Sequence, residues 1–366
     1  MVGKGDHTGR YGLRMRSVVL RQGRLVVRDD VDEPRPGPGQ VLVDVKACGI
    51  CGSDLHFVLH AETMIELGQR MEGTPDVGRT PLDLSHDVFM GHEFCGEVVE
   101  VGPDVGGAGP AGPAPGTIVT SVPVMLTPAG METLAYTNVL PCGYSERMLL
   151  SAALVVEVPN GLDPGHAALT EPMAVGLHAV NRAGITPGDG AVVLGCGPVG
   201  LAVIAALRLR GVEAIVASDL SAARRALASQ MGAHEAVDPR VEPAFEAWAR
   251  SGDGRPLVVF EAIGVPGILD EVLRVAPAQS RVVIVGVCMQ PDTITPFYGI
   301  GKELNLQFVL GYDPAEFEAS LRSIAEGEID VTAMITGEVA LDGVPDAFTQ
   351  LASPDEHCKI LVVPGA

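Results

Sequence analysis

The first part of the chain, roughly 160 residues, alternates hydrophobic and polar positions over short stretches that glycine and proline interrupt. Valine occupies every second position in Val41–Lys46, and this period of two predicts a half-buried strand. The same kind of pattern predicts a hairpin at 16–30 and further strands at 93–101, 117–125, 144–150 and 154–158. Residues 102–116 are nearly all Gly, Pro or Ala and predict an exposed loop. We therefore expect a mostly antiparallel β domain.

After Pro159-Asn160-Gly161 the pattern changes to short apolar runs separated by longer amphipathic stretches. A helix is expected from Glu171. The apolar runs predict strands at 191–194, 214–218, 235–238, 257–261, 281–287 and 304–310. The amphipathic stretches predict helices at 198–210, 221–231, 243–250, 265–276 and 314–326. Such alternation favours a doubly wound parallel sheet, and the fold class is α/β. The last segment, 331–366, predicts a helix at 344–351 and a strand at 359–363.

Length, charge and cysteine content narrow the class of protein. A chain of 366 residues is long enough for two domains. Its formal net charge of −21 disfavours nucleic acid and membranes as partners, and no apolar run approaches the ~20 residues of a membrane span. Residues 1–14 are polar and lack a signal-peptide pattern, so we expect a flexible leader. The seven cysteines, an odd number, indicate reduced thiols and a cytoplasmic protein.

The first chemical motif is a glycine-rich turn, Gly195-Cys196-Gly197-Pro198-Val199-Gly200, between a predicted strand and a predicted helix. Gly195 permits the turn, Gly197 lets the backbone approach a pyrophosphate, and Gly200 lets the helix pack on the strand. Unpaired amides at the start of the helix bind diphosphate. The turn predicts a dinucleotide site.

The next strand ends in Asp219, where a carboxylate can accept both adenosine-ribose hydroxyls and would repel a 2′-phosphate. Arg224 could contact the ribose, although a cation also attracts phosphate. The prediction is NAD in preference to NADP.

The second motif joins Gly49-Ile50-Cys51-Gly52-Ser53-Asp54-Leu55-His56 with Gly91-His92-Glu93. The thiolate of Cys51 and the imidazole of His92 suit a catalytic zinc, which needs one more ligand and an open position. Glu171 is the preferred third ligand because it lies where the β domain meets the nucleotide domain, and Glu93 is the alternative.

Three neighbouring side chains suit supporting roles. Asp54 suits a hydrogen bond to a ligand imidazole. Ser53 and His56 suit proton transfer.

Other interpretations of these residue types are weaker. Cys48 and Cys51 could form a redox pair or half of a zinc knuckle, but there is no thioredoxin-like context and no second Cys-x-x-Cys. We expect His178 to be a satisfied core residue. Further histidines are expected at the surface, namely His60, His86 and His166. The remaining isolated cysteines are expected to be small buried hydrophobes, namely Cys95, Cys196, Cys288 and Cys358.

These motifs, in this order and at this spacing, resemble those of the zinc-containing medium-chain alcohol/polyol dehydrogenases from about Met15 to the C-terminus. The resemblance implies a GroES-like catalytic domain (15–171 and 309–366) and an NAD-binding Rossmann domain (172–308). It implies a zinc shell of Cys51, His92 and Glu171, with Glu93 near or on the metal.

The same resemblance implies roles for residues around the cofactor. It implies a proton relay through Ser53 and His56, and it places Val199 behind the nicotinamide. Lys359 matches a basic residue that contacts the pyrophosphate. A homodimer or homotetramer is expected by the same analogy.

Two departures from the family pattern are visible. Residues 101–143 contain only Cys142, so the four-cysteine lobe that binds a structural zinc in many relatives is missing, and we expect one zinc ion per chain. Residues 57–90 look like an insertion near the substrate entrance.

The tail residues 312–317 and 356–362 are similar to the butanediol and sorbitol dehydrogenase branch. The expected activity is reversible oxidation of a small secondary alcohol, diol or polyol to the ketone or aldehyde. A zinc/NAD enzyme of different net outcome, such as a dismutase or a formaldehyde-adduct oxidase, and a non-catalytic NAD-binding protein are the alternatives.

Overall fold

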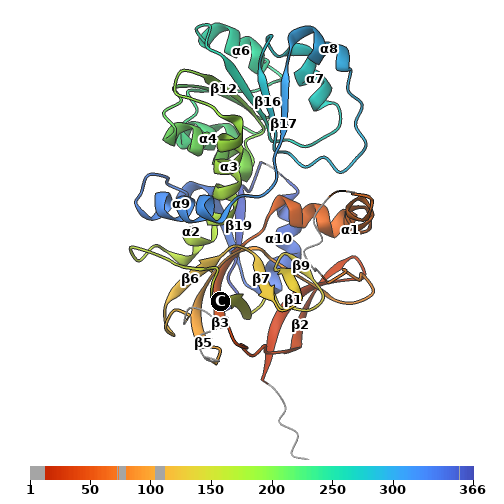
Figure 1. The fold of residues 1–366 in the computed structure, drawn as a ribbon, viewed down its shortest axis with the longest axis vertical. Helices are drawn as coiled ribbons and strands as arrows, with labels where there is room; N and C mark the ends of the chain where they lie inside the picture. The colour runs from red at the N-terminus through yellow and green to blue at the C-terminus, as the bar shows by residue number, and fades with distance from the viewer. Residues whose placement is uncertain (1–12, 72, 74–79, 104–111, 354) are drawn as a thin grey trace, which may run out of the picture.

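The computed structural model describes residues 13–71, 73, 80–103, 112–353 and 355–366. Figure 1 shows a β-rich half at the bottom and a parallel sheet with its helices at the top. The expected leader lies outside the described residues as far as residue 12, and so does the middle of the expected 102–116 loop. In the described part of the chain, no helix is long and apolar enough to cross a membrane.

The β-rich half contains three sheets. A four-stranded sheet has the order β2-β1-β4-β9, and β7 pairs with β8. A seven-stranded sheet has the order β11-β6-β5-β3-β19-β18, with β10 also paired to β3. The bounds are β1 (Arg14–Arg21), β2 (Arg24–Asp32), β3 (Gln40–Gly49), β4 (Val88–Met90), β5 (Glu93–Val101), β6 (Ile118–Ser121), β7 (Val124–Thr127), β8 (Gly130–Thr133), β9 (Tyr136–Thr137), β10 (Arg147–Ser151), β11 (Val155–Glu157), β18 (Ile335–Val339) and β19 (Lys359–Val362). Pairing is antiparallel except between β18 and β19, as the alternating pattern predicts.

The upper half is a six-stranded parallel sheet with the order β14-β13-β12-β15-β16-β17. Its strands are β12 (Gly190–Leu194), β13 (Ala214–Ser218), β14 (Glu235–Val237), β15 (Leu257–Glu261), β16 (Arg281–Ile284) and β17 (Asn305–Phe308). The helices of this half are α3 (Thr170–Ala183), α4 (Pro198–Leu209), α5 (Ala222–Met231), α6 (Ala244–Ser251), α7 (Ile268–Val275) and α8 (Pro296–Lys302). The predicted α/β fold class, with a GroES-like and a Rossmann part, is confirmed. The exact domain limits remain a prediction.

The remaining helices surround the junction between the halves: α1 (Gly52–Arg70), α2 (Pro164–Ala168), α9 (Pro314–Ala325) and α10 (Val344–Leu351). Figure 1 shows α1 and α9 on opposite sides of this junction. One hydrophobic cluster runs from Ala47 and Cys95 in the β half through α3 and α4 into the parallel sheet. A Cβ on Gly176 would collide with the backbone of Ala202, so glycine lets α3 lie directly against α4. The two halves therefore share a packed interior.

Some elements differ from the sequence-based expectation. After Cys51 we expected a turn or short helix, but α1 extends over 19 residues with non-helical torsions at His60. The strand expected to end at 287 ends at Ile284, and α8 was not predicted. Cys288, expected to be buried, is exposed.

Candidate metal and cofactor site

The metal-ligand candidates meet where β3, α1 and β5 converge. Cys51 is the N-cap of α1, directly after β3, and Glu93 begins β5. Ligand atoms of Cys51, His92 and Glu93 lie within 4.8 Å of one another. Strand pairing brings these separate segments together, because Gly49 in β3 is opposite Glu93 in β5. A thiolate, an imidazole and a carboxylate at this spacing are a donor set that zinc prefers.

His92 is oriented by a buried carboxylate. Its Nδ1 lies 3.5 Å from Asp54 Oδ1, and both atoms are buried without a hydrogen bond of good geometry. Asp54 Oδ2 accepts bonds from the Tyr144 hydroxyl at 2.6 Å and from the Cys51 amide at 3.0 Å. Burial acts to lower the pKa of His92, but the Asp54 charge outweighs it and raises that pKa well above its usual value. With Nδ1 turned to Asp54, Nε2 is the nitrogen left for a metal. His92 as a zinc ligand remains a prediction.

Glu93 faces a lysine instead of open space. Lys359 Nζ lies 2.7 and 2.6 Å from Oε1 and Oε2 of Glu93 and donates to the Ile50 carbonyl at 3.0 Å. A Cβ on Gly49 would collide with Glu93 Oε2, so this glycine makes room for the carboxylate. Lys359 is fully buried at the base of the site. This contact differs from the pyrophosphate contact expected for Lys359.

Glu171 approaches from the first turn of α3. Its carboxylate is not in the group of ligand atoms within 4.8 Å, but it lies near enough to His92, Glu93 and Lys359 for electrostatic interaction. Burial and the Glu93 charge raise the pKa of Glu171 to about 7, against the opposing effect of the two cations and Tyr312. Glu171 therefore lies near the other three donors, and its ligation of zinc remains a prediction.

The two predicted relay residues are on α1. Ser53 Oγ lies 3.4 Å from His92 Nε2 and accepts a hydrogen bond from the Tyr136 hydroxyl at 3.0 Å. His56 is exposed on the next turn, and the structure gives no hydrogen bond between the side chains of His56 and Ser53, both of which it describes. Ser53 therefore lies beside the ligand group and His56 faces solvent, and a proton relay through the two remains a prediction.

The glycine turn has the geometry that a dinucleotide site requires. Gly195 has a φ of +90°, and a Cβ there would approach the Ala262 carbonyl oxygen to 2.8 Å. A Cβ on Gly200 would collide with the Gly195 carbonyl, which explains the close packing of α4 on β12. Gly197 caps α4 and Pro198 is its first residue. If Gly197 carried a Cβ, the nearest described atom outside its two chain neighbours would be Arg224 Nη1, at 3.9 Å from that Cβ. Space therefore remains at Gly197 for a phosphate.

Asp219 lies beside this turn. Its carboxylate accepts hydrogen bonds from the amides of Cys196 and Ser221, each at 2.8 Å. Arg224 Nε is buried and has no hydrogen-bond partner in the described part of the chain, so a cationic donor points into the site without a protein acceptor. The turn, the carboxylate and this donor fit a nicotinamide dinucleotide. The role of Val199 behind the nicotinamide remains a prediction.

The sequence analysis missed the tyrosines of the site. Tyr144 holds Asp54, Tyr136 holds Ser53, and Tyr312 lies against Glu171 with its hydroxyl buried. Burial, and then the Glu171 charge, raise the pKa of Tyr312 well above its usual value. No motif marks these tyrosines, since each reaches the site only through tertiary contacts.

Histidines outside the site behave as expected where the structure describes contacts. His178 Nδ1 lies 2.8 Å from Glu316 Oε2, which satisfies the half-buried ring. His60 and His86 are exposed, whereas His166 is half-buried.

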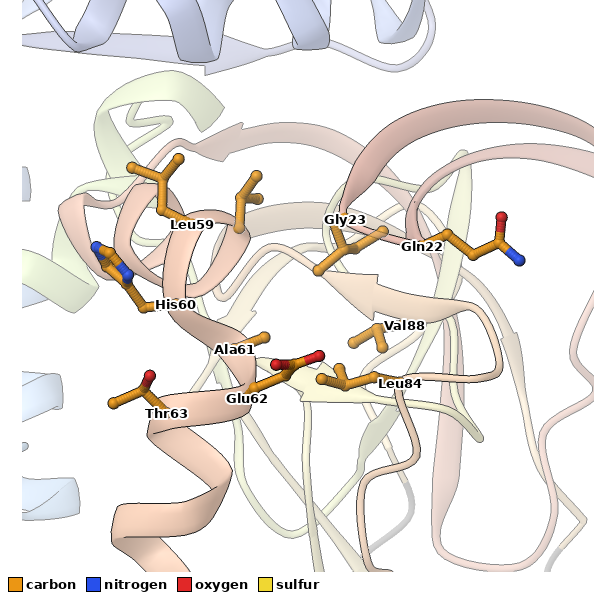
Figure 2. Close-up of a pocket in the computed structure, with 11 residues that line it drawn as sticks. Gln22, Gly23, Leu59, His60, Ala61, Glu62, Thr63, Leu84 and Val88 are labelled. Carbon is orange, nitrogen blue, oxygen red and sulfur yellow. The ribbon is translucent and has the colours of Figure 1, made fainter.

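Of the residues that we compared to an insertion (57–90), the described ones form most of α1, the segment 80–87 and β4. A surface cavity of about 280 Å³ lies beside this half of α1, with Ala61 and Glu62 facing Leu84 and Val88 (Figure 2). None of the residues that line it belongs to the metal-ligand group or to the glycine turn. The predicted relation of this segment to the substrate entrance remains a prediction.

Comparison with known proteins identifies the class to which this fold and site belong. Residues 37–160 match the alcohol dehydrogenase GroES-like domain, and residues 198–326 match the zinc-binding dehydrogenase family. (R,R)-butanediol dehydrogenase of Bacillus subtilis (strain 168) is 33% identical over 350 residues, covering 92% of this chain and 96% of that protein. Sorbitol dehydrogenase of Gallus gallus is 26% identical over 370 residues, covering 96% of each chain.

Solved structures agree with these relatives. The crystal structure of 2R,3R-butanediol dehydrogenase from Bacillus subtilis matches with a TM-score of 0.78 and 31% identity, covering 96% of this chain and 99% of that one. A protein of Sinorhizobium meliloti 1021, described as a zinc-binding dehydrogenase bound to NADP, matches equally well, with 96% of this chain and 100% of that one covered. The chain belongs to the zinc-containing medium-chain alcohol/polyol dehydrogenase family. It is an oxidoreductase acting on a small molecule, and zinc and a nicotinamide cofactor are the cofactors that its family implies.

Proposed function

We propose that this protein is a zinc-dependent, NAD-preferring dehydrogenase that reversibly oxidises a small secondary alcohol, diol or polyol. The observation that carries the proposal is the convergence of Cys51, His92 and Glu93 on one point, with Glu171 near enough for electrostatic interaction. The relatives named for butanediol and sorbitol support diols and polyols as the substrate class.

Zinc supplies Lewis-acid chemistry when bound, and it lowers the pKa of an alcohol hydroxyl placed on it. Cys51 and His92 would hold it, and Glu171 would complete the shell from α3. The absence of the four-cysteine lobe from the sequence supports a single ion per chain. Nδ1 of His92 and Oδ1 of Asp54 are buried and have no hydrogen-bond partner in the described residues. They support His92 as a zinc ligand, because a metal bound to the imidazole would strengthen the interaction between these two atoms.

The chain's own residues would bind, orient and deprotonate the substrate. Ser53, whose Oγ lies 3.4 Å from His92 Nε2, would accept the proton of an alcohol hydroxyl bound at this site, and exposed His56 would pass a proton to solvent. The glycine turn would hold the NAD pyrophosphate at the start of α4. Asp219 would accept the ribose hydroxyls, and its charge supports NAD over NADP.

Two further proposals concern the whole protein. The family analogy supports a homodimer or homotetramer. All seven cysteines lie in the described residues as free thiols, which supports a cytoplasmic protein.

The test is a screen for NADH formation over secondary alcohols, diols and polyols, with and without a chelator. We expect activity that the chelator abolishes, and one zinc ion per chain by metal analysis. Cys51→Ser should lose both zinc and activity, whereas Cys288→Ser, at an exposed cysteine, should lose neither. Two zinc ions per chain would contradict the one-zinc proposal. Turnover of an aldehyde with no net change in NADH would point to the dismutase alternative.

A further inference from the structure

Tyr136 contacts α1 at two side chains on one face. Its hydroxyl donates to Ser53 Oγ at 3.0 Å, and its ring stacks on Phe57 with centroids 4.1 Å apart and planes 9° apart. Ser53 and Phe57 are four residues apart, so they are neighbours on the helix surface. The same ring meets His92 edge-on at 6.0 Å. Tyr136 therefore contacts both the serine and the imidazole that the proposed reaction uses.

The backbone holds Tyr136 in this place. In the β4–β9 ladder Tyr136 is paired with Met90, two residues before His92. The following Thr137 donates its hydroxyl to Glu132, which is buried in β8. Asn138 then donates to the carbonyl oxygens of Asp83 and Asp87. The position of the hydroxyl is thus fixed from both sides of the tyrosine.

A serine hydroxyl has one proton and two lone pairs. Because Tyr136 fills one lone pair of Ser53 Oγ, one lone pair remains for an incoming proton and the Ser53 proton is directed elsewhere. Burial, and then the charges of Asp54 and Cys51, raise the pKa of Tyr136 well above its usual value, so its hydroxyl stays a donor.

We propose that Tyr136 is a positioning residue for proton transfer through Ser53, an inference that rests on the proposed function. In alcohol oxidation the substrate hydroxyl proton would move to Ser53 Oγ while the original Ser53 proton moves to water on the side where His56 is exposed. Tyr136 keeps its own proton throughout. The segment that contains Tyr136, β7 to β9, lies in the region where many relatives carry the four-cysteine lobe.

The test is a double-mutant cycle of Tyr136→Phe and Ser53→Ala, measured by NADH formation with a substrate found in the screen. Phenylalanine keeps the ring that stacks on Phe57 and removes only the hydroxyl. Loss of one hydrogen bond predicts a kcat about 3- to 10-fold lower. The KM values should be nearly unchanged, and the solvent deuterium isotope effect on kcat should rise. Thermal midpoint and zinc content should match the wild type.

In the Ser53→Ala background, Tyr136→Phe should have no further effect on kcat, because the partner is already absent. The control is Tyr298→Phe on α8, which should leave kcat unchanged. Equal losses from Tyr136→Phe with and without Ser53 would overturn the proposal, as would a loss of zinc in proportion to the loss of activity. If Tyr136→Phe kept a wild-type kcat while Ser53→Ala was impaired, the proposal for Tyr136 would be overturned and the proposed function would stand. A wild-type protein without NADH formation on any alcohol would overturn the proposed function as well.

Discussion

The ammonium of Lys359 lies 2.6 and 2.7 Å from the two carboxylate oxygens of Glu93, and neither side chain is exposed to solvent. The pair joins β5 to β19 at the metal-ligand group, to which Glu93 belongs. Burial acts to lower the pKa of Lys359, but the Glu93 charge outweighs it and that pKa is raised. Each charge is therefore retained in the interior only because the other is there.

Replacing Lys359 should destabilise the protein strongly. Lys359→Met leaves the Glu93 carboxylate buried without a counter-charge, and the free energy of unfolding should fall by about 3–5 kcal/mol. Denaturant unfolding measures this change. The double variant Lys359→Met/Glu93→Gln removes both charges and should recover part of the loss. Equal destabilisation in the single and double variants would contradict the charge argument.

The Lys359 contact also shows what the sequence could not predict. Lys359 and Glu93 are 266 positions apart, and no local pattern relates them. By contrast, the strand–turn–helix around Gly195 and the ligand candidates Cys51 and His92 were predictable, because their chemistry depends on short spacings. The positions of the parallel strands along the chain followed from periodicity. The other contacts of the site, such as that between Lys359 and Glu93, depend on tertiary packing.

The length of α1 illustrates the same limit. Its hydrophobic pattern is weak, so we expected only a turn or short helix after Cys51. The start of the helix is held by its two buried residues, Asp54 and Phe57, which contact Tyr144 and Tyr136 respectively. A short stretch of sequence around α1 does not reveal these partners, because they lie far away along the chain.

His56 should affect activity mainly through its protonation. Burial, and then the positive charge of His60, lower the pKa of His56 below its usual 6.5. As the proton acceptor it stays neutral down to that lower pH, so wild-type turnover should fall only below about pH 6.5. His56→Ala should lower turnover mainly where the wild-type ring is neutral, and the difference from wild type should shrink as the pH falls through the lowered pKa. Added buffer should restore part of the loss.

His60→Ala is the matched variant, since it removes the neighbouring charge and should shift the same inflection to higher pH. The measurement is kcat against pH at several buffer concentrations. An unchanged profile in His56→Ala would exclude His56 from the relay.

Asp219 should control the choice of dinucleotide. Asp219→Asn removes the charge that repels a 2′-phosphate while keeping the shape of the side chain beside Arg224. We expect the ratio of kcat/KM for NADP to that for NAD to rise at least about 10-fold. Asp253→Asn, at an exposed loop residue, makes the same charge change away from the site and should leave the ratio unchanged. A variant with an unaltered ratio would show that Asp219 does not contact the ribose.

Glu316 should make the attachment of α9 to α3 dependent on pH. Its carboxylate lies 2.8 Å from His178 Nδ1 and accepts from Asn181 Nδ2 at 2.6 Å and from the Asp313 amide at 2.8 Å. Burial acts to raise the pKa of Glu316, but these hydrogen bonds and the His178 charge outweigh it and lower that pKa below its usual 4.5. A depressed carboxyl pKa contributes stability above the unfolded-state pKa, and this contribution is lost as the pH falls through the folded-state pKa.

Glu316→Gln should therefore lower the thermal midpoint at neutral pH, and the difference from wild type should shrink as the pH falls below about 4.5. The measurement is thermal unfolding of both proteins between about pH 3 and pH 7. Glu318→Gln, at an exposed position of the same helix, should show no such pH-dependent difference. A difference that stayed constant over this range would contradict titration of the Glu316 carboxyl as its cause, because the amide keeps the shape of the side chain and cannot titrate.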